Sequence, residues 1–182
     1  MWSASDAWLV VIDPQRIFAD PDSPWGSPMF PSIVAPVRRL AEHFGGRVIV
    51  TRWVAPRPAV GSWSAYLSAW PFADVPGNDP LFDVVDELAD LDARVLSAPT
   101  FGKWGPELSA ITGPAPRLVV TGVSTDCCVI STALAAADAG ATLTVVTDAC
   151  AGSTPENHRR ALDVMALYPP QITLATSADV RP

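Results

Sequence analysis

One stretch of the chain, residues 118–152, constrains the fold more than any other. It reads LVVTGVSTDCCVISTALAAADAGATLTVVTDACAG: an apolar run, a turn with two adjacent cysteines, an alanine-rich helical pattern and a second apolar run. A strand that turns directly into a helix places that turn at the carboxyl edge of a parallel sheet, where open α/β sheets bind ligands. A cysteine at a helix N-terminus also feels the positive end of the helix dipole, which favours the reactive thiolate. The segment therefore indicates a parallel α/β fold and a candidate nucleophile.

The rest of the chain alternates between strand-like and helix-like patterns. Short apolar runs typical of buried strands occupy residues 7–12, 47–51, 94–97, 118–121, 143–147 and 172–175. Apolar residues at helical spacing, or helix-forming segments with stop signals, occupy residues 33–44, 81–88, 126–138 and 155–167. This alternation predicts an α/β protein with three αβα layers and a six-stranded, mostly parallel, Rossmann-like sheet.

Composition predicts one domain spanning residues 1–182. A chain of 182 residues with 49% hydrophobic residues is long and apolar enough to bury a substantial core. The net charge of −7 argues against a surface for nucleic acid or anionic membrane. No apolar run approaches the ~20 residues needed to span a bilayer. Three cysteines, two of them adjacent, make a poor disulfide framework, and the first residues lack the basic stretch of a secretory signal. We therefore expect a cytoplasmic protein.

An insert rich in Trp and Pro interrupts the alternation at residues 53–78, WVAPRPAVGSWSAYLSAWPFADVPGN. A segment of this length without clear periodicity inside a compact domain is typically a functional loop. Trp53, Trp63 and Trp70 would be costly to leave exposed. They are expected to cover a pocket, to pack into a partner subunit or to cap the edge of the core, and the sequence does not separate these roles.

Three polar residues follow the ends of predicted strands. Asp13 precedes Pro14 and taken alone is a common way to begin a helix, with the aspartate as N-cap. Lys103, in the loop TFGKWGPEL, would ordinarily be a solvated lysine, and Cys128 would ordinarily be a small core hydrophobe. All three, however, follow the carboxyl ends of parallel strands, where side chains converge. Their joint placement favours a shared chemical role.

The motifs around these residues resemble those of the isochorismatase-like cysteine hydrolases, which include nicotinamidases, N-carbamoylsarcosine amidases and ureidoacrylate-type amidohydrolases. The matching pieces are DPQRIF at residues 13–18, the lysine of FGKWG, and GVSTDCCV followed by VVTDACAG, in the same order along nearly the whole chain. The resemblance implies a catalytic triad of Asp13, Lys103 and Cys128. The nucleophile of the motif immediately precedes Val129, so Cys128 and not Cys127 is matched.

The resemblance also implies how the reaction would be supported. The oxyanion of the tetrahedral intermediate would be met by the backbone N–H groups of Ser124 and Cys128, and the family has a cis peptide bond at the position of Val123–Ser124. Lys103 and the helix N-terminus would stabilise the Cys128 thiolate, while Asp13 would act as general base and then acid. Asp126 and Thr125 are expected to fix the turn through side-chain hydrogen bonds.

Metal-binding nicotinamidases carry an Asp and histidines after their second strand, whereas Arg52 and Val54 stand at the corresponding positions here. We therefore predict no metal and no cofactor, and nicotinamide becomes a less favoured substrate. Arg52 would hold a substrate carboxylate, shape the pocket or form a structural ion pair. The full set of residues expected to line a substrate pocket is Gln15, Phe18, Arg52, Trp53 and Trp104.

The expected activity is that of a metal-independent cysteine hydrolase that cleaves a C–N bond of a small carboxamide or ureido compound through a thioester. The alternatives are a vinyl ether hydrolase of the isochorismatase type, whose members generally lack a cysteine here, and a non-catalytic member of the fold. The expected partners are a small-molecule substrate and further copies of the chain, as a homodimer or homotetramer, with the insert as the candidate interface.

Overall fold

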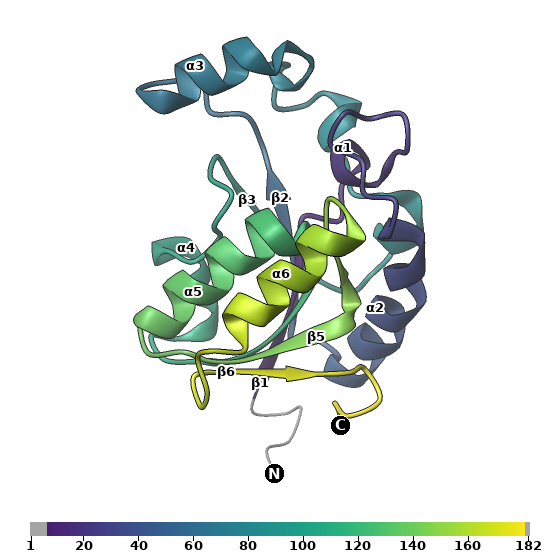
Figure 1. Cartoon of the computed structure of the whole chain (residues 1–182), viewed down its shortest axis with the longest axis vertical. Helices are drawn as coiled ribbons and strands as arrows, with labels where there is room; N and C mark the ends of the chain where they lie inside the picture. The colour runs from purple at the N-terminus through teal and green to yellow at the C-terminus, as the bar shows by residue number, and fades with distance from the viewer. Residues whose placement is uncertain (1–6, 181–182) are drawn as a thin grey trace.

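The computed structural model describes residues 7–180, which contain one six-stranded sheet in the order β3-β2-β1-β4-β5-β6 (Figure 1). Every pair of neighbouring strands is parallel. The strands are β1 (Ala7–Ile12), β2 (Val48–Trp53), β3 (Arg94–Ala98), β4 (Arg117–Val123), β5 (Thr142–Ala151) and β6 (Ile172–Ala175). The sheet confirms the predicted fold class, and β4 and β5 extend beyond the predicted runs. Cys150 lies within the added length of β5.

Helices cover both faces of the sheet, with α5 and α6 on one side and α2 on the other (Figure 1). The helices are α1 (Arg16–Ala19), α2 (Phe30–Phe44), α3 (Ser62–Ala69), α4 (Pro106–Thr112), α5 (Ile130–Asp138) and α6 (Pro155–Met165). In α2 the buried side chains include Ile33, Val37, Leu40 and Phe44, at the spacing that keeps one face of a helix toward the sheet. None of the helices in residues 7–180 has the length and apolarity to cross a bilayer.

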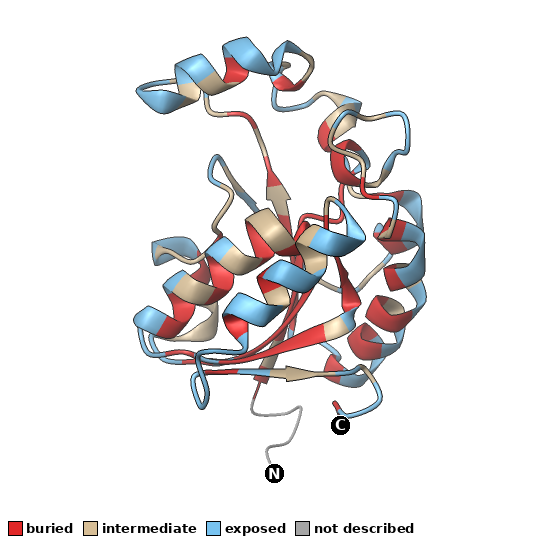
Figure 2. Cartoon of the chain, viewed as in Figure 1, coloured by how far each residue is buried: buried red, intermediate tan, exposed pale blue. Residues whose placement is uncertain are grey.

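The core lies between the helices and the central strands, which are the most buried elements (Figure 2). All residues of β1 except Trp8 are buried, and β4 is buried from Leu118 to Val123. Strands buried on both faces need continuous apolar runs rather than alternating ones. This requirement explains why LVVI and LVVTGV form the two central strands.

The helix predicted over residues 81–88 is wrong. Two short 3-10 turns, Pro80–Phe82 and Asp86–Leu88, take its place and are separated by extended backbone. Val84 forms an antiparallel bridge with Gln15, and the backbone N–H of Val85 donates to the carbonyl of Pro14. These contacts with the segment after β1 satisfy backbone groups that a helix would have used internally.

The insert at residues 53–78 contains more regular structure than expected. It holds α3 and a 3-10 turn at Pro71–Ala73, and α3 lies beyond the carboxyl ends of the strands (Figure 1). Of its tryptophans, Trp53 is fully buried, Trp63 is half-buried and Trp70 is 39% exposed. The insert therefore combines a core residue with side chains at the sheet edge where the candidate nucleophile lies.

Candidate active site

The structure brings Asp13, Lys103 and Cys128 together at the carboxyl edge of the sheet. Asp13 follows β1, and Cys128 lies in the turn after β4, which is the neighbour of β1 in the sheet. Lys103 lies in the loop after β3. Lys103 Nζ is 2.8 Å from Asp13 Oδ2, and the Cys128 side chain lies close enough to the Asp13 carboxylate to lower its pKa. All three residues are buried. The carboxylate is thus paired with the ammonium and interacts with the thiol.

Asp13 is held by β2 and does not cap a helix. Its backbone N–H donates to Thr51 Oγ1 over 3.1 Å, and Thr51 Oγ1 donates to Asp13 Oδ1 over 2.6 Å. Its φ of 43° lies in the left-handed region that a residue with a side chain rarely adopts. Helix α1 begins later, at Arg16, with Gln15 as its N-cap. The helix-capping interpretation of Asp13 is therefore wrong. Thr51 was not identified from the sequence, where its only signal is a polar residue ending an apolar run.

Lys103 is held with its ammonium directed at three oxygen acceptors. Besides Asp13, Nζ donates to the carbonyl of Thr100 over 2.6 Å and to that of Phe101 over 2.8 Å. The backbone N–H of Lys103 donates to Thr132 Oγ1, which donates in turn to the carbonyl of Cys128. Thr132, another residue that sequence reasoning did not single out, therefore connects the lysine loop to the nucleophile turn.

The turn that carries Cys128 is a single π-helical turn, Thr125–Val129, which continues into α5. The carbonyl of Ser124 accepts hydrogen bonds from the N–H groups of Cys127 and Val129. The Val123–Ser124 peptide bond is cis, as the resemblance implied. Two residues before Ser124, Gly122 has a φ of 109°, and a Cβ there would lie 2.1 Å from the carbonyl oxygen of Ile12. Only glycine allows β4 to approach β1 so closely beside the site.

Side-chain hydrogen bonds anchor this turn to the start of α6. Asp126 accepts from the N–H of Ser153 and from its hydroxyl, both over 2.7 Å. Thr125 Oγ1 lies 2.8 Å from His158 Nδ1. The expectation that Asp126 and Thr125 fix the turn is therefore confirmed.

The surroundings raise the pKa of both the Asp13 carboxyl group and the Cys128 thiol. Burial raises the pKa of Asp13, against the lowering effect of the Lys103 charge and of the hydrogen bonds to the carboxylate. The pKa of Cys128 is raised well above its ordinary value by the hydrogen bond with Cys127, by burial and by Asp13. Lys103 opposes this but does not prevail. The raised pKa favours a resting Cys128 thiol beside the Asp13 carboxylate rather than the expected thiolate.

Cys127 differs from its neighbour in exposure and acidity. It is half-buried at the pocket, and the hydrogen bond with Cys128 lowers its pKa, against the effects of burial and of Asp126. Burial raises the pKa of the third thiol, Cys150, inside β5. Cys127 is therefore a second thiol at the same pocket, which makes variants at both positions necessary for assigning the nucleophile.

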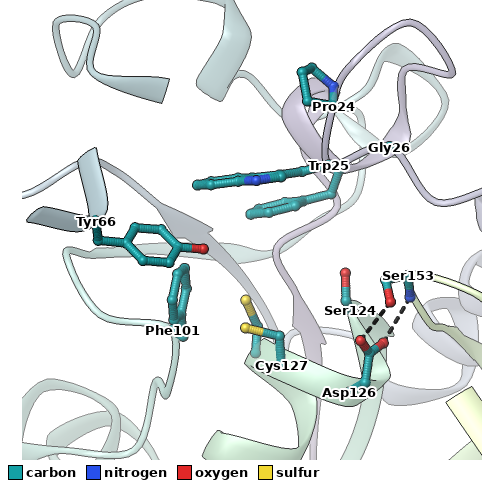
Figure 3. Close-up of a pocket in the computed structure, with 11 residues that line it drawn as sticks. Pro24, Trp25, Gly26, Tyr66, Phe101, Ser124, Asp126, Cys127 and Ser153 are labelled. Carbon is teal, nitrogen blue, oxygen red and sulfur yellow. Dashed lines mark hydrogen bonds between the residues drawn. The ribbon is translucent and has the colours of Figure 1, made fainter. Parts of the chain in front are cut away.

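A pocket of about 230 Å³ opens beside the two cysteines. Trp25, Tyr66 and Phe101 lie on one side of it, and Ser124, Asp126, Cys127 and Ser153 lie on the opposite side (Figure 3). Phe18, Pro24, Gly26 and Cys128 complete the lining. The walls come from the segment after β1, the insert, the loop after β3 and the turns after β4 and β5. A small, partly apolar molecule placed here would meet the Cys128 thiol.

Of the residues expected to line the pocket, only Phe18 does so. Gln15 is fully buried and ties loops together, accepting from the N–H of Trp53 and donating to the carbonyls of Trp53 and Phe82. Arg52 donates to the carbonyl of Phe82 and faces a different hollow, so the structure does not place it at this pocket, where two of the three roles left open for it would put it.

Two tryptophans also lie outside the pocket. Trp53 lies behind its aromatic wall, with its ring centroid 5.8 Å from that of Phe101. Trp104 packs beside a separate small cluster of Ile49, Leu96 and Leu108. Trp25, Tyr66 and Phe101 were not identified from the sequence, because nothing in their local pattern separates a pocket wall from a core edge.

Within residues 7–180, no three His, Cys, Asp or Glu side chains are grouped so that they could hold a metal ion. The Asp13 carboxylate already pairs with Lys103, accepts a hydrogen bond from Thr51 and interacts with Cys128.

A parallel α/β sheet with a buried Asp–Lys–Cys cluster at its carboxyl edge is the arrangement that the motifs around residues 13, 103 and 128 led us to expect for an isochorismatase-like hydrolase. A model of the isochorismatase domain matches residues 7–179, and the chain belongs to this family of hydrolases. A search of curated proteins found no match to the sequence.

Solved structures share the fold. A cysteine hydrolase from Pseudomonas syringae pv. phaseolicola 1448A superposes with a TM-score of 0.81 at 18% identity, covering 99% of this chain and 93% of that chain. An isochorismatase family protein from Desulfovibrio vulgaris subsp. vulgaris str. Hildenborough gives 0.73 at 22% identity, covering 96% and 95%. PnC1 from L. infantum, in complex with nicotinate, gives 0.76 at 14% identity, covering 97% and 95%.

Proposed function

We propose that this protein is a metal-independent cysteine hydrolase that cleaves the C–N bond of a small carboxamide or ureido compound through a thioester. The observation that carries this proposal is the placement of the Cys128 thiol. It lies at the pocket beside the buried Asp13 carboxylate, and that carboxylate is paired with Lys103 over 2.8 Å. A nucleophile within hydrogen-bond reach of an oriented base is the arrangement that covalent acyl transfer needs.

In the first half-reaction Cys128 Sγ attacks the substrate carbonyl carbon while its proton passes to Asp13. The new S–C bond produces a tetrahedral intermediate with a negatively charged oxygen. When the C–N bond breaks, Asp13 returns the proton to the departing nitrogen, and ammonia or an amine leaves. The raised pKa of Asp13 suits this double role, because a stronger base takes the thiol proton more readily.

In the second half-reaction a water molecule attacks the thioester carbonyl, and Asp13 takes one of its protons. The C–S bond then breaks, the acid product leaves, and the proton returns to Cys128. Lys103 holds the carboxylate in place through both steps and balances its charge when it is ionised. The cycle ends with the thiol and the carboxylate in their starting states.

The oxyanion of each intermediate would be met by the backbone N–H groups of Cys128 and Ser124. Cys128 lies in the first turn of a helical segment, where N–H groups lack partners one turn earlier. Ser124 precedes that turn and lines the pocket. A preorganised donor of this kind contributes roughly 3–4 kcal/mol in acyl transfer.

The test is release of ammonia from a panel of primary amides, ureido acids and carbamoyl compounds, with isochorismate included as a vinyl ether. We expect turnover of at least one amide or ureido compound, lost by about 10³-fold or more in Cys128→Ala. The matched control Cys127→Ala should retain turnover, because the proposed steps form no bond to that thiol. Activity that survives in Cys128→Ala but disappears in Cys127→Ala would contradict the assignment, and turnover of isochorismate alone would replace the amidase proposal.

A further inference from the structure

The charges around the pocket bear on the charge of the substrate that it would accept, if the protein acts on amides as proposed above. Among the described residues that line the pocket, Asp126 alone carries a formal charge. The ammonium of Lys103 is out of reach, since its side chain is fully buried and directed at Asp13 and two carbonyls. Arg52 faces another hollow. A substrate carboxylate would therefore lose its hydration without gaining a cationic partner.

Asp126 has no ion-pair partner among residues 7–180. Its two oxygens accept hydrogen bonds from the N–H and hydroxyl of Ser153, and the carboxylate borders the pocket (Figure 3). Arg160 lies with Asp126 around a neighbouring hollow but is paired with Glu156 over 2.6 Å. Burial lowers the pKa of nearby His158, against the influence of Asp126, so the imidazole is mainly neutral at pH 7. The negative charge is thus left to face the pocket.

The opposite wall is aromatic. The ring centroid of Tyr66 lies 5.8 Å from that of Trp25 and 5.6 Å from that of Phe101, and the centroids of Trp25 and Phe101 are 6.5 Å apart. Burial raises the pKa of Tyr66, so its phenol stays uncharged. Aromatic rings attract cations through the negative charge of their faces, and cages of such rings bind quaternary ammonium groups.

We propose that the pocket selects small amides that carry a positive charge, with the ammonium group held between the Trp25–Tyr66–Phe101 wall and Asp126. Asp126 is then the residue that determines charge specificity. The scissile amide points toward Cys128, on the same side of the pocket as Asp126. An uncharged amide of equal shape binds less well, and an anionic one is excluded.

Three primary amides of matched length test this proposal: 3-(trimethylammonio)propanamide, its neutral isostere 4,4-dimethylpentanamide, and succinamate. We expect kcat/KM to fall in that order, with about tenfold between the cation and its neutral isostere. In Asp126→Asn the amide side chain can keep the hydrogen bonds with Ser153, so this variant removes the charge and should remove the preference for the cation.

The chain offers a matched control in Asp148. This exposed aspartate accepts from the N–H and hydroxyl of Ser177, as Asp126 does from Ser153, but lies outside the pocket. Asp148→Asn should leave the order of the three amides unchanged. Equal rates for the cation and its isostere, a preference for succinamate, or an unchanged order in Asp126→Asn would each overturn the proposal.

Binding separates this inference from the proposed function. The Kd of each amide is measured by calorimetry on the Cys128→Ala protein, which holds the pocket charges but lacks the nucleophile. The cation binding most tightly with no turnover by the unaltered protein would contradict the amidase function and support the charge selection. Turnover of these amides without a charge order in Kd or kcat/KM would support the function and overturn the selection.

Discussion

Asp13 and Lys103 form an ion pair with 2.8 Å between Oδ2 and Nζ, and both side chains have no exposed surface. Removing one member of such a pair leaves the other charge buried without a partner, at a cost of about 3–5 kcal/mol. We therefore expect Lys103→Met to lower the free energy of unfolding by about that amount. The double variant Asp13→Asn/Lys103→Met should regain much of this stability but no activity. Urea unfolding and ammonia release measure the two effects.

The control for this cycle is the surface pair of Arg38 and Asp90, whose side chains are 40% and 67% exposed. Solvent screens such a pair, so Arg38→Met should change the unfolding free energy much less than Lys103→Met does. Equal effects of the two substitutions, or a double variant as unstable as Lys103→Met, would show that the buried pair does not act as a coupled unit.

His158 should make stability depend on pH. Burial lowers its pKa below the ordinary 6.5, so the unfolded chain takes up a proton at a higher pH than the folded protein does. The unfolding free energy should therefore fall as the pH drops through 6.5 and level off below the folded pKa. His158→Gln should flatten this dependence of stability on pH. The control His43→Gln, at an exposed position of α2, leaves His158 in place and should show the same dependence as the unaltered protein. Urea unfolding at several pH values measures the slopes; a stability that rises on acidification over this range contradicts the assignment.

Chelation should leave turnover unchanged. Arg52 and Val54 stand where metal-binding relatives carry their ligands, and Arg52 is engaged with the carbonyl of Phe82. The proposed steps use the side chains of Cys128, Asp13 and Lys103 and two backbone N–H groups, and they need no metal ion. Ammonia release is measured after dialysis against EDTA and again after addition of Zn²⁺ or Fe²⁺. A loss of activity that either ion restores would refute the metal-independent mechanism.

The insert remains our candidate for contacts between subunits. Two large apolar residues of the insert are exposed: Val60 at 67% and Trp70 at 39%. If the protein is a homodimer or homotetramer joined through the insert, Val60→Lys should place a charge in the interface and shift the sedimentation coefficient toward the monomer. Val164→Lys, at a 42% exposed position of α6, should leave it unchanged. A monomeric unaltered protein at micromolar concentration would count against the interface.

The sheet was predictable from the sequence because its strands are short apolar runs buried on both faces. Where the prediction fails, a contact with a segment distant in the sequence determines the backbone conformation. Residues 81–88 have apolar residues at helical spacing, but the bridge between Val84 and Gln15 makes extended backbone more favourable. That bridge depends on a contact across the fold, which a local pattern does not contain.

The candidate site divides in the same way. Asp13, Lys103 and Cys128 were predictable because each ends or follows a recognisable strand and lies in a motif. Their supports, Thr51 and Thr132, act through single hydroxyl contacts that become visible only when β2 and α5 are placed. The aromatic pocket wall comes from three separate segments, two loops and helix α3, and no local pattern fixes how those segments pack together.

The approach of β4 to β1 beside the site gives a last prediction. A Cβ on Gly122 would lie 2.1 Å from the Ile12 carbonyl oxygen, and the φ of 109° is itself unfavourable for any other residue. Gly113 shares a positive φ of 93° but has open space around its Cβ position. We expect Gly113→Ala to cost about 1–2 kcal/mol from backbone strain alone. Gly122→Ala adds the steric clash, so it should cost more than about 3 kcal/mol or prevent folding. Soluble yield and urea unfolding compare the two variants, and equal stability would show that β4 can shift away from β1 without penalty.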